Sequence, residues 1–467
     1  MSPDPLGLEP EDMRRLGYWV VDRVVDHLEG RDERPALSMD TPERLREALG
    51  GPVPTGPGDP VEAMTALVEV ALATMQHTDH ARFFARVPGP SSYPAVLGEW
   101  LGTGFQAIAA SWGGGAGPTT VELVVIEWLR ELLGLPAGTE GVLLSGGSMA
   151  NLTGLLAARH QQGDGVVYVS DQTHSSIGRG LARSGFADVR VLPTGDELAL
   201  TVEQVAATVA EDRASGRTPT IVVATAGTTN TGAVDPLVGL ADLCAAESLW
   251  LHVDGAYGAP AALAPSGRPL LVGLHRADSL VLDGHKWLFQ PYDLGVLLVR
   301  RPGALERAFS MNPEYLADVT AGVGEVDLRN RSLELSRRGR ALKLWLTFRT
   351  YGADALGAAI ERGILLAESA QDLLEADAGW EVVTPAQLGI VTFVRVDATD
   401  ADHVRAADTL TASGYAALST TVLGGRTVLR LCTINPRTTE ADLAETLARL
   451  AVTIGEEQDP SPDAIGT

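Results

Sequence analysis

Residues 220–258 read TIVVATAGTTNTGAVDPLVGLADLCAAESLWLHVDGAYG, and this stretch decides the fold. Two short apolar runs, 220–225 and 249–254, flank a segment at 236–247 in which apolar residues recur at helical spacing. Each run is continuously apolar rather than alternating, which is typical of a strand that is buried on both faces of a sheet. A strand, a helix and a second strand of this kind indicate parallel pairing through a crossover helix.

The same pattern extends outward in both directions. Further apolar runs lie at 141–147, 165–171, 188–194, 279–287 and 293–301. The last run follows its predecessor too closely for a crossover helix, so we predict that one strand is antiparallel. The sequence therefore predicts an α/β protein with a mainly parallel seven-stranded sheet.

The regions outside this pattern differ in character. Residues 1–82 contain two amphipathic helical stretches that are joined by a Pro- and Gly-rich segment. After a long helical region, the last unit alternates strand, helix, strand and helix, which predicts a small α+β domain. We expect four parts: an N-terminal helical segment (1–82), a large α/β domain (83–350), a small C-terminal α+β domain (351–455) and a disordered tail (456–467).

The composition restricts the possible functions. The chain has 36 Lys and Arg against 60 Asp and Glu, a net charge of −24 that disfavours binding to nucleic acid or anionic lipid. No apolar run reaches the ~20 residues of a membrane span, and the acidic start does not resemble an export signal. Cys244 and Cys432 suit neither a disulfide framework nor a metal site. We expect a cytoplasmic protein that acts on small molecules, without a metal.

Polar side chains follow the predicted strands. Ligands of such sheets bind beyond the carboxyl ends of the strands, so these side chains should converge on one composite site. They are Ser145–Ser148, Asp171–His174, Thr225–Thr229, Asp254–Tyr257 and Asp283–Lys286.

Two of these residues indicate a particular cofactor. Lys286 follows an apolar strand beside His285 and Trp287, where partial desolvation favours its neutral, nucleophilic amine. Asp254 ends another buried strand and needs a cationic partner, which a protonated pyridinium nitrogen would be. Alone, either residue could instead be a surface lysine or a helix-capping carboxylate. Together they supply what pyridoxal 5′-phosphate requires.

The phosphate of this cofactor needs backbone N–H groups at a helix start. The sequence SGGSMANL, with Gly147 and Ser148, supplies glycines and a hydroxyl directly before a helix. His285 is placed to reach the phosphate, and His174 could stack on the ring, although a capping histidine is the simpler interpretation of the latter. Thr228 and Thr229 could bind the ring substituents.

These motifs stand in one collinear order. FFARVPGPSSYPAVLGEWL, GGSMANL, SDQTHSS, ATAGTTNTGAVDPL, HVDGAYG, GHKWL and NPEYL together resemble the group II pyridoxal-phosphate decarboxylases, and most closely the aromatic-L-amino-acid decarboxylases. The resemblance runs from about residue 10 to 450. It implies the aspartate aminotransferase-like fold (fold type I) and the release of CO2 and an amine from an L-amino acid.

The resemblance also implies the roles of individual residues. Lys286 would bind the cofactor covalently, Asp254 would pair with the ring nitrogen and His174 would stack on the ring. Tyr315, in a closing loop at about 311–331, would protonate the carbanion left by CO2. Further cofactor contacts would come from Gly147, Ser148, Thr229, Ala256, Asp283 and His285.

The substrate pocket would include Phe84, Arg86, Pro88 and Ala110, and here the chain departs from the family pattern. Arg86 and Ala110 stand where relatives commonly carry aromatic residues, and GHK replaces the more usual PHK. A roomier pocket with a guanidinium would suit a polar or acidic side chain, unless Arg86 forms a structural ion pair that points away. The substrate thus stays open between aromatic and related polar L-amino acids.

Three alternatives to this activity remain. Oxidative decarboxylation–deamination would give an aldehyde, although Tyr315 argues against it. An aminotransferase of similar fold would need an arginine signature for the α-carboxylate, and none is clear. A catalytically silent binding protein with this fold would be favoured by loss of Lys286 or Asp254. Because residues 1–82 form too thin a layer to bury their own apolar faces, we also expect an obligate homodimer.

Overall fold

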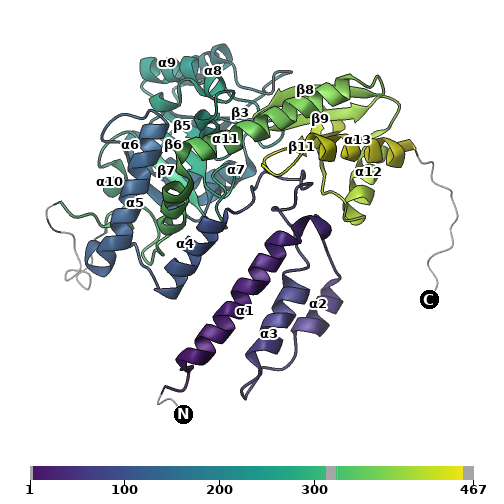
Figure 1. Ribbon diagram of the computed structural model, residues 1–467. Coiled ribbons are helices and arrows are strands. Elements are labelled where there is room, and N and C mark those ends of the chain that lie inside the picture. Colours follow the sequence, from purple (N-terminus) through teal and green to yellow (C-terminus); the bar gives the residue numbers. More distant parts are fainter. Residues whose placement is uncertain (1–3, 312–321, 323, 456–467) are drawn as a thin grey trace.

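The computed structural model of the chain describes residues 4–311, 322 and 324–455 (Figure 1). Its larger sheet contains the strands β1 (Glu140–Leu144), β2 (Val166–Ser170), β3 (Asp188–Leu192), β4 (Pro219–Thr225), β5 (Trp250–Asp254), β6 (Ser279–Asp283) and β7 (Gly295–Val299). They lie in the order β1-β7-β6-β5-β4-β2-β3. All neighbours pair in parallel except β7, which is antiparallel to β1 and to β6. The predicted seven-stranded, mainly parallel sheet with one antiparallel strand is confirmed.

Helices cover both faces of this sheet. They are α4 (Tyr93–Gly104), α5 (Trp112–Leu132), α6 (Gly147–Gln162), α7 (Ser175–Arg183), α8 (Val202–Ala214), α9 (Leu237–Glu247), α10 (Ala304–Phe309) and α11 (Ala341–Glu375). In β4, Ile221 and Val223 join a core cluster with residues of α6, α7 and α10, whereas Val222 and Ala224 join one with residues of α5, α8, α9 and α11. Burial on both faces explains why these strands are continuously apolar.

A second, antiparallel sheet lies in the C-terminal part, in the order β10-β11-β9-β8. Its elements are β8 (Trp380–Gln387), β9 (Ile390–Arg395), α12 (Asp400–Ala412), β10 (Ser419–Leu423), β11 (Arg426–Cys432) and α13 (Glu440–Gly455). The central strands β9 and β11 were predicted. The edge strands β8 and β10 were not, because β8 contains a proline and both are only partly buried, which weakens the strand pattern.

Helix α11 connects the two sheets. It kinks at Gly352, whose φ of 75° lies in the left-handed region. The predicted boundary between residues 350 and 351 falls at this kink, inside the helix, and the predicted domain limits stay predictions. No helix in the described parts of the chain is both long enough and apolar enough to cross a membrane.

The N-terminal helices project from the body of the molecule (Figure 1). They are α1 (Pro10–Glu29), α2 (Pro42–Leu49) and α3 (Pro60–Ala66), and none of them has a buried residue. Large apolar side chains are exposed on α1 and in the segment that follows α3, including Tyr18 (66%), Leu67 (54%) and Leu72 (55%). The predicted disordered tail, 456–467, lies outside the described residues.

Candidate cofactor and active site

The candidate site lies beyond the carboxyl ends of the central strands. Thr225, Asp254 and Asp283 are the last residues of β4, β5 and β6, and Thr225 is aligned with Asp254 in the sheet register. A cavity of about 250 Å³ opens there. It is lined by Val87, Ser145, Gly146, Gly147, Ser148, Asn151, His174, Ser176, Thr225, Gly227, Thr229, Asp254, Ala256, Tyr257, Asp283, His285 and Lys286. The structure thus brings residues from all five predicted strand ends into one cavity, although Thr228 does not line it and Asp171–His174 contributes only His174.

A glycine turn forms one wall of the cavity. Gly146, at φ +117°, precedes α6, and no side chain caps the N-terminus of that helix. A Cβ on Gly147 would meet the Cβ of Ala256 at 3.0 Å. Because Gly146 and Gly147 carry no side chains of their own, a ligand can approach the N-terminus of α6 closely, and a helix N-terminus favours a phosphate.

Asp283 orders this wall. Its Oδ2 accepts a hydrogen bond from the Gly147 N–H at 3.0 Å, and its Oδ1 lies 2.7 Å from Nδ1 of His285. The His285 ring also packs against Tyr292, with ring centroids 4.6 Å apart. Asp283 therefore fixes the glycine turn and His285 together, which is a more specific role than the predicted lining of the cofactor.

Lys286 and Asp254 meet in the same cavity. Asp254 is 5% exposed, and its Oδ1 accepts a hydrogen bond from the Ala256 N–H at 3.1 Å. Within the described ranges no lysine, arginine or histidine forms an ion pair with this carboxylate. A buried carboxylate without a cation is costly, so the site is suited to a ligand that brings a positive nitrogen.

His174 stands at the mouth of the cavity. It precedes α7 and accepts a hydrogen bond from the Ser176 N–H at 3.3 Å, so the simpler capping interpretation also holds. Burial and the charge of Lys286 lower the pKa of His174, while the charge of Asp254 opposes this shift. The imidazole is therefore held neutral, and its ring borders the same cavity as Lys286, Thr229 and Ala256.

The predicted substrate-pocket residues do not line this cavity. Phe84 is fully buried in the core of the C-terminal unit, with Phe393 and Leu429, so its side chain serves packing there. Arg86 is exposed, Pro88 is half-buried, and Ala110 is buried, with its carbonyl accepting from the Arg329 N–H. From this segment only Val87 reaches the cavity.

Three segments that are far apart in the sequence are joined by backbone hydrogen bonds next to Lys286. The Gly89 N–H donates to the carbonyl of His285 at 3.1 Å, and a Cβ on Gly89 would lie 2.4 Å from the carbonyl oxygen of Lys286. The Phe84 N–H donates to the carbonyl of Ala417, and the Phe84 carbonyl accepts from the Cys432 N–H. The segment at 84–89 therefore fastens the lysine loop to the C-terminal sheet.

Two features of the cavity lining were not predicted from the sequence: the unpaired hydroxyl of Thr225, although Thr225 itself was expected at the site, and the presence of Asn151. The Thr225 hydroxyl is buried in the cavity wall without a hydrogen-bond partner among the described residues. Asn151, three residues after Ser148 on α6, accepts a hydrogen bond at 3.0 Å from His252, whose pKa burial lowers to about 4. Helical spacing from Ser148 could have identified Asn151, whereas the contact with His252 depends on tertiary packing. Tyr315 lies outside the described residues.

The described residues fit pyridoxal 5′-phosphate. The unpaired carboxylate of Asp254 suits a pyridinium nitrogen, the bare glycine turn suits a phosphate, and the free Thr225 hydroxyl suits a polar ligand group. Lys286 lines the same cavity, and its amine suits covalent attachment of an aldehyde.

Comparisons with known proteins agree with this geometry. The aromatic-L-amino-acid decarboxylase of Bacillus atrophaeus is 43% identical, over 95% of this chain and 96% of the relative. A phenylacetaldehyde synthase of Arabidopsis thaliana is 32% identical, over 94% and 95%. A crystal structure of Oryza sativa TDC with PLP and tryptamine superposes with a TM-score of 0.90 at 30% identity, covering 97% of this chain and 99% of that one.

The predicted fold type, with pyridoxal phosphate as the cofactor, is thereby confirmed. The profile described as "Pyridoxal-dependent decarboxylase conserved domain" matches residues 42–396, which include every cavity residue described above. The chain therefore belongs to the pyridoxal-dependent decarboxylase family and is a pyridoxal-phosphate-dependent amino acid decarboxylase.

Proposed function

We propose that this decarboxylase acts on aromatic L-amino acids and releases the corresponding arylalkylamine and CO2. The observation that carries the proposal is the meeting of Asp254 and Lys286 in one cavity beside a bare glycine turn. The relative that is 43% identical along nearly the whole chain bears the name of an aromatic-L-amino-acid decarboxylase, which supports the aromatic class.

Several cavity residues have a proposed part in this reaction. Bound pyridoxal phosphate supplies an electron sink for the carbanion that forms when CO2 leaves. Asp254 holds a proton on the ring nitrogen, and Lys286 anchors the cofactor through its Nζ. Gly147, Ser148 and His285 hold the phosphate, with Asp283 fixing the first and the last of them.

The remaining parts are the ring contacts and the proton donor. His174, Thr229 and Ala256 border the ring. Tyr315 delivers a proton to the substrate Cα, a role that rests on the family resemblance alone. Release of an amine instead of an aldehyde depends on this last proton transfer, because a carbanion that is not protonated stays available to an oxidant.

We also propose that the protein is a homodimer. The helices α1, α2 and α3 have no buried residue, and large apolar side chains are exposed on α1, at the end of α2 and after α3, which is unfavourable for an isolated chain in water. A second copy would cover them. We expect a dimer by light scattering at micromolar concentration, and a monomer there would refute this part. A location in the cytoplasm stays a prediction from the sequence.

The decisive experiment offers the purified, cofactor-loaded protein a panel of aromatic, acidic and polar L-amino acids. CO2, amine, aldehyde and peroxide are measured together, and Lys286→Ala serves as the inactive control. Equal amounts of amine and CO2 from aromatic substrates support the proposal. Aldehyde and peroxide as main products would establish the oxidative alternative, and turnover of acidic substrates alone would refute the aromatic assignment. Tyr315→Phe should shift product from amine to aldehyde.

A further inference from the structure

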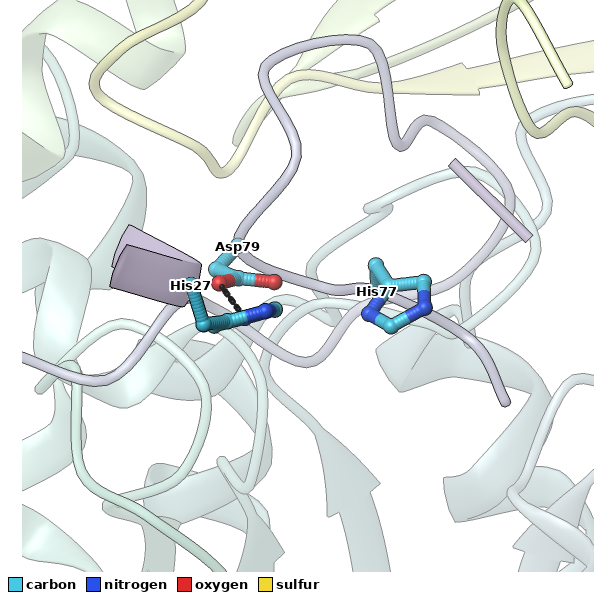
Figure 2. A group of neighbouring side chains, drawn as sticks. All are labelled: His27, His77 and Asp79. Carbon is cyan, nitrogen blue, oxygen red and sulfur yellow. Dashed lines mark hydrogen bonds and ion pairs between the residues drawn. The ribbon is translucent and has the colours of Figure 1, made fainter. Parts of the chain in front are cut away.

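A cluster of metal-ligating side chains lies outside the cofactor cavity, where the C-terminal end of α1 meets the segment that follows α3. It consists of His27, His77 and Asp79, and one ligand atom from each lies within 4.8 Å of the other two. Figure 2 shows a ring nitrogen of His77 on the side that faces His27, with the Asp79 carboxylate beside His27. Two imidazoles and one carboxylate are a common ligand set of zinc.

His77 gives the strongest indication that the cluster has a ligand. The side chain is only 4% exposed, and its buried Nδ1 makes no hydrogen bond of ordinary geometry in the described parts of the chain, although the ring also interacts with the Ala73 backbone. A buried polar atom is almost always satisfied, so an imidazole with an unpartnered nitrogen, in a ring that borders two other ligating groups, requires an explanation.

The other two groups are already ordered and need little movement. Nε2 of His27 lies 2.7 Å from Oδ2 of Asp79, so these two groups already hold each other in place. Two ligand atoms of one tetrahedral zinc ion lie about 3.3 Å apart, given bond lengths of roughly 2.0–2.1 Å. Side-chain rotations can therefore convert the present separations into a coordination sphere with water as a fourth ligand.

We propose that His27, His77 and Asp79 form a binding site for a divalent transition metal, with zinc as the best-fitting ion, that ties the end of α1 to the segment at 77–80. The sequence predicts no metal site in this protein, because His27 and His77 are 50 residues apart and only the fold brings them together. Since α1 has no buried residue, the metal would provide a firm link between this helix and the rest of the chain.

Arg34 would compete with the metal for the His27 imidazole. Its Nη1 lies 3.0 Å from Nδ1 of His27, and a guanidinium can only donate, so Nδ1 accepts and Nε2 carries the proton that Asp79 receives. When the metal binds at Nε2, that proton is lost to solvent, Nδ1 takes one up, and the exposed Arg34 side chain must leave. Removal of the guanidinium should therefore strengthen metal binding, which a merely structural hydrogen-bond cluster does not predict.

The test uses the full-length holoenzyme, stripped with a chelator, freed of excess pyridoxal phosphate and titrated with Zn2+ by calorimetry and with Co2+ by visible absorbance. We expect one equivalent per chain. His27→Gln and Asp79→Asn should each weaken binding by about 10- to 100-fold or more. Arg34→Gln should tighten it several-fold. His275→Gln, on the short helix Leu274–Arg276, is the matched control and should bind as the parent does.

His77→Gln is the direct variant, but a buried residue can fail to fold when it is changed, so the proposal is judged on the parent protein and on the half-exposed His27. The thermal midpoint of the parent should rise with Zn2+ concentration, and that of His27→Gln should not. Absence of saturable Zn2+ binding to the parent would overturn the proposal. Equal affinity of the parent, His27→Gln and Asp79→Asn would also overturn it, since the ion would then bind elsewhere.

Discussion

The buried pair of Arg337 and Glu122 makes a sharp prediction about stability. Both side chains are fully buried, with Nη2 of Arg337 2.5 Å from Oε1 of Glu122. The same guanidinium donates to the carbonyl of Leu143 at 2.7 Å and to that of Ala109, while Oε1 of Glu122 accepts from the Leu143 N–H at 2.8 Å. Arg337 thus connects α5, the end of β1 and the loop before α5.

Arg337→Met should destabilise the protein strongly. It would leave the Glu122 carboxylate buried without a cation, and breaking a buried pair in this way costs about 3–5 kcal/mol. At ~2.1 cal/mol/K per residue, the predicted unit of residues 83–350 melts with an entropy on the order of 0.6 kcal/mol/K. The thermal midpoint should therefore fall by roughly 5–9 °C in calorimetry at a fixed scan rate.

The neighbouring arginine provides a matched control. Arg338 forms ion pairs with Glu99 and Asp293, but its side chain is 45% exposed. Because exposed pairs contribute about 0–1 kcal/mol, Arg338→Met should lower the midpoint by less than about 2 °C. In the double variant Arg337→Met with Glu122→Met no charge is left buried, so part of the loss should be regained. Equal shifts for the two arginine variants, or no recovery in the double variant, would refute the reasoning.

Three further predictions concern the site and the core. Gly146→Ala should weaken pyridoxal-phosphate binding to the apoenzyme on the order of 10-fold in an absorbance titration, because the φ of +117° at this turn is strained for alanine. Gly216→Ala, in an open turn at φ +77°, is the control and should leave cofactor affinity unchanged. Burial raises the pKa of Asp235 to about 6, above its unfolded value, so its contribution to stability is full below about pH 4 and is lost as the pH rises through 6. The thermal midpoint of the parent should therefore fall relative to that of Asp235→Asn between pH 4 and 7, and a constant difference would contradict this. Arg86→Ala should change KM for phenylalanine and for an acidic substrate alike, since Arg86 is exposed and does not line the cavity; a larger loss for the acidic substrate would restore the specificity role inferred from the sequence.

The sequence predicted the larger sheet because its physical cause is local. A strand that is covered on both faces must be apolar at every position, so β4 and β5 are visible as continuous runs whatever they pack against. The cluster at the strand ends was also predictable, since Thr225, Asp254 and Asp283 end parallel neighbours and must therefore meet at one edge.

The rest of the site depends on contacts between distant segments. Nothing local distinguishes Phe84, which is buried in the C-terminal core, from Val87, which reaches the cavity. The unpaired hydroxyl of Thr225 and the contact between Asn151 and His252 arise only from tertiary packing. The edge strands β8 and β10 were missed for a related reason, because a partly covered strand can carry proline and polar residues without losing its place.

The fastening of the lysine loop by the segment at 84–89 has a consequence for biosynthesis. The segment at 84–89 is synthesised early, but its backbone partners lie at 285 and, much later in the chain, at 417 and 432. A nascent chain therefore cannot close the wall of the cavity until the ribosome has released nearly all of it. Pyridoxal phosphate should accordingly bind only after translation. A chain stalled shortly after Lys286 should therefore lack the visible absorbance of the bound cofactor.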